Sequence, residues 1–290
     1  ILGLLIGIAR LSTNYLISRL ANAYIELFRN IPILLQILFW YNIFLNALPH
    51  PKKSMSFFDL IFINNRGFYL PNPQPQDGFI WVFIAFIIGI FSAVYLKRHF
   101  KRKQDETGQH TNTLGYTLGL IILLPILVFL ALGSPLQFDY AILGKFNLKG
   151  GLAVVPEFVA LTLALSVYTA TYIAEAIRSG IEAVDKGQKE AAAAIGLTKT
   201  QSLKLVVLPQ ALRVAIPPTI NQYLNLTKNS SLAAAIGYPE LMSAFGGTVL
   251  NQVGQAIEIL TMVMIVYLVI SLAISLLLNY VNKKMAIQGR

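Results

Sequence analysis

The sequence predicts an all-α integral membrane protein, on the grounds of its composition, its apolar segments and its charge distribution. Of the 290 residues, 56% are hydrophobic and only 12% are charged, whereas about a quarter of the residues of a soluble domain are charged. Apolar segments close to the ~20 residues that a helix needs to cross a bilayer recur along the chain. The net charge of +10 could indicate nucleic-acid binding. However, basic segments between such apolar segments are typical of the cytoplasmic loops of a membrane protein, so we expect no nucleic-acid partner.

The first half of the chain predicts three spans after an incomplete first helix. Only nine apolar residues precede Arg10 and the chain does not begin with methionine, so we expect it to start inside a span, with sequence missing upstream. The expected segments are the end of a helix at 1–9, an interfacial segment at 10–30, a span at 31–48 with Pro32 in its first turn, an extramembrane loop at 50–77, a span at 79–96, a basic loop at 97–113, and a span at 114–133 that Pro125 kinks.

The second half predicts a loop at 134–155, a span at 156–177, a polar segment at 178–213 and a final span at 257–281. Between the last two, Pro217-Pro218 is expected to open an apolar helix. Lys228 follows Pro217 by eleven residues, which takes a helix only about halfway across the hydrocarbon. Either this helix is tilted and Lys228 reaches the interface, or it breaks near the midplane and a second piece at 232–244 completes the crossing.

The distribution of basic residues predicts the orientation. With the C-terminus inside, 17 of the 23 Lys and Arg residues fall in inner segments and 5, including Lys145, fall in outer loops, while Lys228 lies within the membrane. Such an asymmetry follows the positive-inside rule. The sequence therefore predicts that the C-terminus and the segment 178–213 are cytoplasmic.

The segment 187–209 predicts a pair of short helices at this cytoplasmic surface. The alanine-rich run from Gln188 to Ile195 favours a helix that Gly196 can end. Thr198 with Gln201 has the spacing of a capping box, which would start a second helix running to Leu208. Such a projecting pair either docks a partner protein or lies on the membrane and on its own loops.

The sequence gives no indication of catalysis. His50, His99 and His110 fall in predicted loops, and no phosphate-binding glycine loop, HExxH or Gly-x-Ser-x-Gly motif occurs. Cysteine is absent, so thiolate metal ligands and disulfides are excluded. Carboxylates within the predicted spans, such as Glu157 and Glu258, lie near span ends rather than as the buried pair of an ion-coupled carrier. We therefore expect that the chain is not an enzyme, binds no cofactor and is driven by a partner.

Several spaced motifs resemble the permease subunits of ABC importers for polar amino acids. The resemblance covers the chain except for about residues 49–150. Its motifs are Glu190-Ala-Ala-x-x-x-Gly196 with Leu208-Pro209, Tyr24-x-Glu26-x-Phe28-Arg29-Asn30-x-Pro32 with Gln36, Glu175-x-x-x-Ser179-Gly180-Ile181, Gly187-Gln-Lys-Glu190, Pro209-Gln-Ala-Leu-Arg213, Pro217-Pro218 and Lys228-Asn-Ser-Ser-Leu232.

The resemblance implies a type I ABC-importer-like permease core of five helices, forming one transmembrane domain over residues 1–290. The two spans at 79–133 would be an inserted helical hairpin, as in the larger permease subunits of general L-amino-acid and glutamate/aspartate importers. The implied setting is the bacterial plasma (inner) membrane. The implied partners are a homologous or identical permease, a cytoplasmic ABC ATPase dimer that uses ATP and Mg, and a periplasmic or surface-tethered amino-acid-binding protein.

The resemblance also implies site residues. The segment 178–213 would be the cytoplasmic coupling loop, with Gly196 setting the angle of its first helix and Pro209 ending the next. The residues expected to dock the ATPase are Gly187, Glu190, Ala191, Ala192, Ala193, Ile195, Gly196 and Leu197.

An intramembrane lysine beside a helix break suggests a polar patch on the substrate pathway. Its expected members are Asn221, Asn225, Lys228, Asn229, Ser230 and Ser231, with Gln36, Tyr41 and Asn42 as weaker candidates. The patch could instead only satisfy freed backbone groups and pack a dimer. The main alternatives for the whole chain are a self-sufficient channel, an ion-coupled secondary amino-acid carrier and an intramembrane enzyme.

Overall fold

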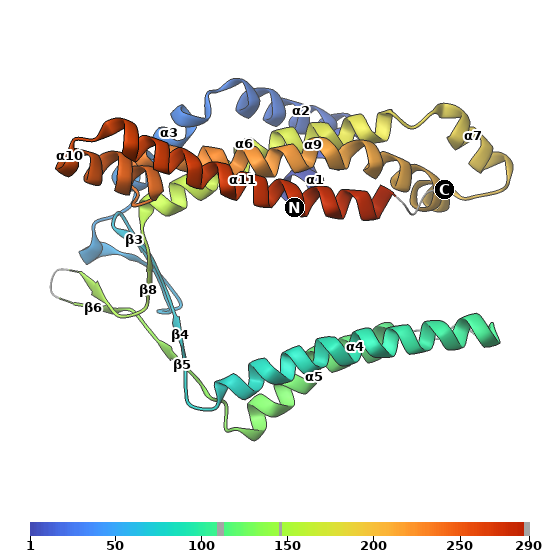
Figure 1. Cartoon of the computed structure of the whole chain (residues 1–290), viewed down its shortest axis with the longest axis horizontal. Helices are drawn as coiled ribbons and strands as arrows, with labels where there is room; N and C mark the ends of the chain where they lie inside the picture. The colour runs from blue at the N-terminus through green and yellow to red at the C-terminus, as the bar shows by residue number, and fades with distance from the viewer. Residues whose placement is uncertain (109–112, 145–146, 287–290) are drawn as a thin grey trace. The chain divides into compact units, whose positions relative to one another are not determined.

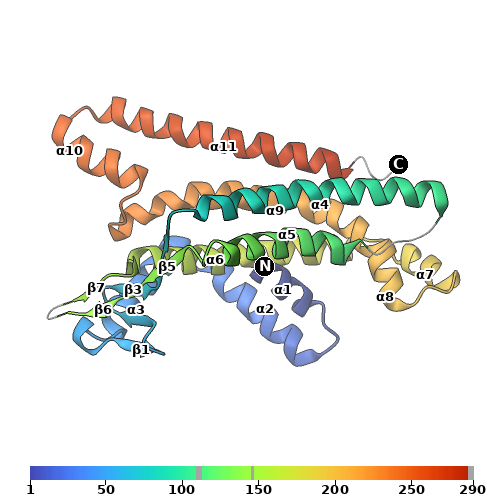
Figure 2. The same cartoon turned by 90° about the horizontal axis from the view of Figure 1, so that it is seen from below.

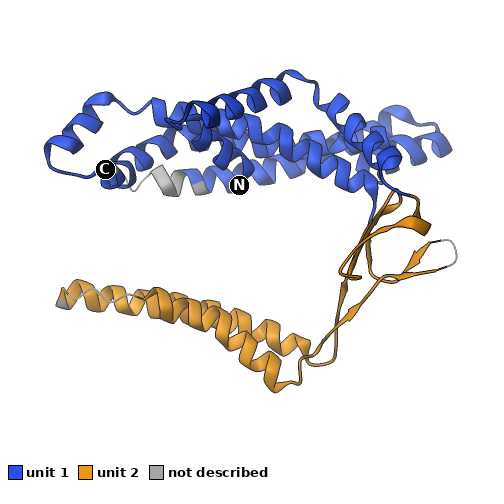
Figure 3. Ribbon diagram, turned by 180° about the vertical axis from the view of Figure 1, so that it is seen from behind, with its two compact units in different colours: residues 1–49, 154–290 blue, residues 50–153 orange. Residues whose placement is uncertain are grey.

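The structure is a computed structural model that describes residues 1–108, 113–144 and 147–286. His110 and Lys145 therefore lie outside the described residues. The chain divides into two compact units, which are described separately (Figure 3). Unit 1 comprises residues 1–49 and 154–290, and unit 2 comprises residues 50–153.

Unit 1 is built around α6 (Pro156–Glu182). This helix packs against α1 (Leu2–Arg10), α2 (Tyr15–Asn30), α3 (Ile33–Ala47) and α9 (Leu208–Asn229) (Figure 1). Ala160, Ala164 and Ala174 of α6 are fully buried. Small side chains let helices approach closely where lipid supplies no hydrophobic driving force. The alanine-rich sequence of α6 thus explains why this helix is the centre of the unit.

The bend between α2 and α3 corrects the span predicted at 31–48. The two helices meet at 102°, with Pro32 as the N-cap of α3. The buried Gln36 amide donates to the carbonyl oxygens of Phe28 (2.8 Å) and Ile31 (2.9 Å), which satisfies groups at the end of α2. With 15 residues, α3 is only about 22 Å long. It passes as a span only when it is joined to α2.

The helix pair predicted at 188–208 continues directly into the next long helix. The short helix α8 (Lys199–Ser202) leads into the wide turn η2 (Leu203–Val207) and then into α9 without a break. Pro209 therefore does not end a helix, and Pro217-Pro218 do not open one but lie inside α9. Directly before Pro209, the N–H of Leu208 bonds to the carbonyl of Leu203, five residues back. This wider turn leaves room for the proline ring, which would otherwise meet the preceding turn.

The early start of α9 also changes the position of Lys228. Since α9 begins at Leu208, Lys228 lies about 30 Å along the helix, which corresponds to the full thickness of the hydrocarbon rather than half of it. After Asn229 the chain forms the 3₁₀ helix η3 (Ser230–Ile236) and turns at Gly237. The second piece predicted at 232–244 is thus not one helix. It is followed by η4 (Met242–Val249), α10 (Leu250–Val253) and α11 (Ala256–Ala286).

Unit 2 contains the helices α4 (Phe79–Thr107) and α5 (Leu114–Ala131), which run side by side (Figures 1 and 2). The basic loop predicted at 97–113 is wrong over most of its length, because α4 continues through Lys97 to Thr107. Lysine and arginine are good helix formers, so a change from apolar to basic residues does not by itself end a helix. Pro125 lies inside α5 as predicted.

The predicted loops at 50–77 and 134–155 contain short strands, so the expectation of an all-α chain is wrong there. The 3₁₀ turn η1 (Pro51–Lys53) is followed, within the described residues, by eight strands: β1 (Met55–Phe57), β2 (Ile61–Asn64), β3 (Gly67–Leu70), β4 (Asn72–Pro75), β5 (Leu136–Asp139), β6 (Ile142–Leu143), β7 (Leu148–Lys149) and β8 (Leu152–Val154). Four of these strands form a sheet of order β1-β2-β3-β8, and β4-β5 and β6-β7 form two further pairs. The β2–β3 hairpin closes with Asn64 opposite Gly67.

Within the described residues, five helical segments are long and apolar enough to cross a membrane, or up to six if the bent pair α2–α3 counts as one span. The five are Phe79–Glu106, Leu114–Ala131, Pro156–Glu182, Thr200–Ile236 and Ala256–Tyr280. The chain is therefore a mostly helical, multi-pass membrane protein.

Candidate functional site

The first helix of the candidate docking segment is α7 (Lys186–Ala194), which begins two residues before the predicted start. The Asp185 carboxylate accepts a hydrogen bond of 2.6 Å from the N–H of Gly187 and so caps its N-terminus. At the other end, the N–H of Gly196 donates to Ala193 and the N–H of Leu197 donates to Ala192. These two bonds form a Schellman motif with Gly196 in the left-handed conformation, φ +83°. Gly196 ends the helix as predicted.

The predicted capping box of the second helix is confirmed. The Gln201 side chain accepts from the N–H of Thr198 at 2.9 Å, and the Thr198 hydroxyl accepts from the N–H of Gln201 at 3.3 Å. This reciprocal pair satisfies two backbone donors at the start of α8. Both ends of the turn between α7 and α8 are therefore fixed by local hydrogen bonds.

The inner side of α7 is attached to the long helices. Ala192 is buried, at 3% exposure, and the Gln210 amide of α9 donates to Gln188 at 3.3 Å. Beneath this attachment, Val184, Val207 and Ala211 form a buried apolar cluster. A hollow of about 320 Å³ beside α7 is lined by Ile181, Lys189, Ala193, Leu197, Ser202, Leu203 and Val207. A displacement of α7 would thus be transmitted to α6 and α9.

The outer side of α7 carries most of the predicted docking residues. Gly187, Glu190 and Ala191 are exposed, and Ile195 exposes 77% of its surface. Ala193 and Gly196 are also exposed, and Leu197 is half-buried beside the hollow. Ala192 differs from the expectation: it faces inward and packs within the loop, so it presents no surface to a partner here. Figures 1 and 2 show α7 at one end of unit 1.

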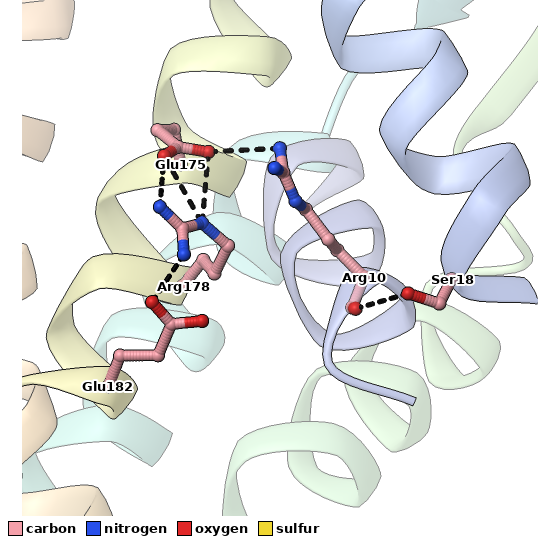
Figure 4. Close-up of polar contacts among 5 residues, drawn as sticks. All are labelled: Arg10, Ser18, Glu175, Arg178 and Glu182. Carbon is pink, nitrogen blue, oxygen red and sulfur yellow. Dashed lines mark hydrogen bonds and ion pairs between the residues drawn. The ribbon is translucent and has the colours of Figure 1, made fainter. Parts of the chain in front are cut away.

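An ion cluster ties α6 to α1 near the start of this loop (Figure 4). Glu175 lies between two arginines, with Arg178 Nη2 at 2.6 Å and Arg10 Nη1 at 3.2 Å. Arg178 also pairs with Glu182 one turn further along α6. On the α1 side, the Ser18 hydroxyl donates to the Arg10 carbonyl oxygen at 2.8 Å. The sequence places Glu175 in a motif, but nothing in its spacing reveals that Arg10 and Glu175, 165 residues apart, form a pair.

The close approach of α6 and α9 beside this cluster depends on Gly180. A Cβ atom at this position would lie 2.6 Å from the Ala211 carbonyl oxygen and 2.9 Å from the Ala215 Cβ. No side chain larger than hydrogen fits without moving the two backbones apart. The glycine of the Ser179-Gly180-Ile181 motif is therefore explained by helix packing.

Three of the predicted pathway residues share one exposed face of α9. Asn221, Asn225 and Lys228 are spaced at i, i+4 and i+7, and all three are exposed. Within the described part of the chain, none of their side chains takes part in a hydrogen bond or ion pair. A polar face on a membrane helix is costly against lipid and therefore indicates water or another protein opposite it.

Two of the three remaining pathway candidates satisfy local groups. The Ser230 and Ser231 hydroxyls donate to the carbonyl oxygens of Thr227 (2.7 Å) and Lys228 (2.8 Å) at the end of α9. Asn229 is half-buried at the same helix end. Ser230 and Ser231 thus fit the alternative in which they compensate the ending helix.

The weaker pathway candidates on α3 also have partners. Gln36 stabilises the α2–α3 bend, and the Tyr41 hydroxyl donates to Glu157 at 3.2 Å. The Asn42 side chain donates to the carbonyl oxygen of Leu38 in its own helix. Asn42 also lines a shallow groove of about 610 Å³ along α3. Gln36, Tyr41 and Asn42 thus each form a hydrogen bond within the protein.

Glu240 is a half-buried carboxylate that the sequence reasoning overlooked. Its oxygens accept from the N–H groups of Met242 (2.8 Å) and Ser243 (2.5 Å) and from the Tyr267 hydroxyl (2.9 Å). With three donors around it, Glu240 caps a helix start. Its position three residues after Gly237 and directly after Pro239 is the sequence feature that indicates a helix cap here. In the described ranges no group of three His, Asp or Glu side chains gathers as metal ligands would.

Comparison with known proteins identifies the family. The profile described as "binding-protein-dependent transport system inner membrane component" matches residues 85–287. A chain of Escherichia coli (strain K12), YhdX, whose name as an amino-acid ABC transporter permease is itself provisional, is 54% identical over 290 residues. The match covers all of this chain and 74% of that one.

Two further relatives have related names. The general L-amino acid transport system permease protein AapQ of Rhizobium johnstonii is 52% identical, over 100% of this chain and 72% of that protein. The glutamate/glutamine/aspartate/asparagine transport system permease protein BztB of Rhodobacter capsulatus is 40% identical, over 98% and 73% of the two chains.

A solved structure shares the fold. The crystal structure of an amino acid ABC transporter with histidines matches with a TM-score of 0.55 at 20% identity, over 98% of this chain and 83% of that chain. At this identity the match supports the helical architecture alone. The family profile and the relatives carry the assignment: the chain belongs to the family of binding-protein-dependent transport system inner membrane components, the permeases of amino-acid ABC transporters.

Proposed function

We propose that this permease is a subunit of an ATP-driven importer of polar L-amino acids in the inner membrane. The proposal rests on the family and on the names of two relatives, which refer to general L-amino acids and to glutamate, glutamine, aspartate and asparagine. In this account the chain forms the translocation pathway with a second, homologous or identical permease. An amino-acid-binding protein delivers the substrate, and a cytoplasmic ATPase pair supplies the ATP and Mg²⁺ chemistry. An ion-coupled carrier is not favoured by these comparisons.

The observation that carries the coupling role is the arrangement of α7. Its inner side is held by Ala192 and Gln188, while its outer side exposes Glu190, Ala191 and Ile195. An exposed isoleucine surrounded by alanines offers an apolar contact that a partner surface can approach closely. Because the Schellman motif and the capping box fix the turn after α7, force on α7 would pass to α9 as rigid-body motion.

The pathway role belongs to the exposed face of Asn221, Asn225 and Lys228. In a pair of permeases this face of α9 would meet water or the partner subunit rather than lipid. Amide and ammonium groups offer donors and acceptors to the charged and polar parts of an amino acid. Asn229, Ser230 and Ser231 would hold the end of α9 that carries Lys228.

The hairpin α4–α5 would be an addition to a five-helix core. Two successive spans return the chain to the side from which it came, so they leave the orientation of every later helix unchanged. With the C-terminus inside, the ends of α4 and α5 around residues 97–114 and the loop of α7 would both be cytoplasmic.

The docking assignment is tested by co-purification of the ATPase with the permease. Glu190→Lys or Ile195→Glu should release or uncouple the ATPase while the permease remains in the membrane. Glu106→Lys makes the same charge change at an exposed position outside α7 and should leave co-purification unchanged. If both α7 variants retain the ATPase and ATP-dependent uptake, the coupling role of α7 is wrong.

A further inference from the structure

The end of α4 carries a compact basic surface to which the proposed function assigns no role. Tyr95, Arg98, His99 and Arg102 are spaced at i, i+3, i+4 and i+7, which places them on one face of the helix. They line a shallow depression of about 230 Å³. We call these four residues the basic face.

Several contacts give the basic face its shape. The rings of Tyr95 and His99 are stacked, with centroids 6.5 Å apart and planes 15° from parallel. Phe100 stacks on Tyr116 of α5 at 6.1 Å, which supports this turn of α4 from the neighbouring helix. In the described part of the chain no ion pair involves Arg98 or Arg102, so both guanidinium groups retain their donors.

The position of the basic face along α4 identifies its ligand. The apolar part of the helix, Phe79–Leu96, has 18 residues and a length of about 27 Å, close to the thickness of the hydrocarbon. The basic residues begin at Lys97, so they emerge at the level of the lipid headgroups. Tyr95, 70% exposed, lies where tyrosine is enriched at membrane interfaces.

The chemistry of the basic face fits a lipid phosphate. Arginine binds phosphate oxygens with parallel hydrogen bonds, and two arginines one turn apart can hold one headgroup between them. Basic clusters next to a membrane helix are attracted to anionic lipids. We infer that the basic face binds the phosphate headgroup of an anionic phospholipid and so anchors the α4–α5 hairpin to the leaflet in which α4 ends.

The test measures how much phosphatidylglycerol remains bound to the purified full chain, in nanodiscs that mix it with phosphatidylcholine. The variant Arg98→Gln/Arg102→Gln removes two charges from the basic face and should lower the affinity for phosphatidylglycerol by about tenfold. The matched control is Lys97→Gln/Lys101→Gln, which removes two charges from the same stretch but from the other side of the helix, outside the depression. This control should lose at most a few-fold in affinity.

Three results would overturn the inference. An equal loss in both variants would show attraction to basic charge in general rather than a site. Unchanged phosphatidylglycerol binding in Arg98→Gln/Arg102→Gln would show that the face binds no lipid. Displacement of the lipid by millimolar inorganic phosphate would show that the face takes free phosphate instead. Helix content by circular dichroism should be the same in both variants, since all four positions are exposed.

Discussion

Gly196 has the most constrained backbone in the coupling loop. Its φ of +83° strains any side chain with a Cβ branch, and the Schellman bonds of α7 depend on this conformation. Gly196→Val should therefore change the angle of α7 and reduce ATP-driven uptake at least several-fold, while membrane insertion is retained. Ala194→Val adds a similar side chain at an exposed helical position of the same helix and should have little effect. Uptake equal to wild type in Gly196→Val would refute this role.

Gly180 is constrained by contact rather than by conformation. Gly180→Val would force a side chain against the Ala211 carbonyl oxygen, which lies 2.6 Å from the position of a Cβ, and should destabilise the protein by about 1–3 kcal/mol. Gly119→Val is the matched control, because no atom beyond its chain neighbours and the backbone of its own helical turns lies within 4 Å of a Cβ at Gly119. Thermal unfolding in detergent measures both. Similar midpoints for the two variants would contradict the packing role.

For single residues, the sequence predicts a contact only where the two partners are a few positions apart in the chain. The capping box of Thr198 and Gln201 and the end of α7 at Gly196 follow from residues a few positions apart, so the sequence predicts them. The inward side of Ala192 depends on how α7 packs against its own loop, and the pair of Arg10 and Glu175 depends on the meeting of α1 and α6. Neither can be derived from spacing.

At the scale of the helices, the ion cluster stabilises the contact between α1 and α6. The charged side chains of the cluster differ in how much they contribute to the stability of the protein. Glu175 is paired with two arginines and is about three-quarters buried, whereas Glu182 is half exposed. An exposed i,i+4 pair contributes little. Glu175→Gln should therefore destabilise the protein clearly more than Glu182→Gln does in the same thermal unfolding measurement. Equal effects would indicate that the contact between α1 and α6 does not depend on this charge.

A double-mutant cycle of Arg10→Gln and Glu175→Gln measures the contact between the two helices directly. A coupling of about 0.5–3 kcal/mol is expected for groups in contact. Strictly additive effects would contradict the ion pair between α1 and α6.

The errors in element boundaries have two physical causes. Prolines were expected to separate helices, but the wide turn η2 accommodates Pro209, and α9 accommodates Pro217-Pro218 within its length. Basic residues were expected to form a loop, but Lys97–Lys103 continue α4 because their propensity is helical. The apolar segments themselves correspond to α4, α5, α6 and α11 with small shifts, since their length and composition are decisive.

For the whole molecule, the sequence predicts the family and the spans that correspond to α4, α5, α6 and α11, but not the span formed by η2, α9 and η3 or the strands of unit 2. Those strands are two to four residues long, too short for alternation to be recognised. The sequence predicts one polar patch over residues 221–231, and the structure divides its members into those with hydrogen-bond partners among the described residues and those without. Ser230 and Ser231 bond to the helix end, while Asn221, Asn225 and Lys228 remain exposed on one face.

Transport tests the role of that face. Lys228→Ala should reduce uptake several-fold or change its preference among amino acids, while ATPase co-purification is unchanged, because Lys228 lies on the proposed pathway and not on α7. Lys149→Ala, in the strand β7, is the control with the same substitution. Unchanged uptake with normal expression of Lys228→Ala would exclude a pathway role for this lysine.

The central claim, that this permease imports polar amino acids through a partner ATPase, is tested most directly in proteoliposomes that contain the permease pair and the ATPase. Uptake is measured across a panel of amino acids, with and without ATP and the binding protein. The account predicts that polar L-amino acids enter only when both are present. Uptake that proceeds without ATP, driven by an ion gradient alone, would contradict it.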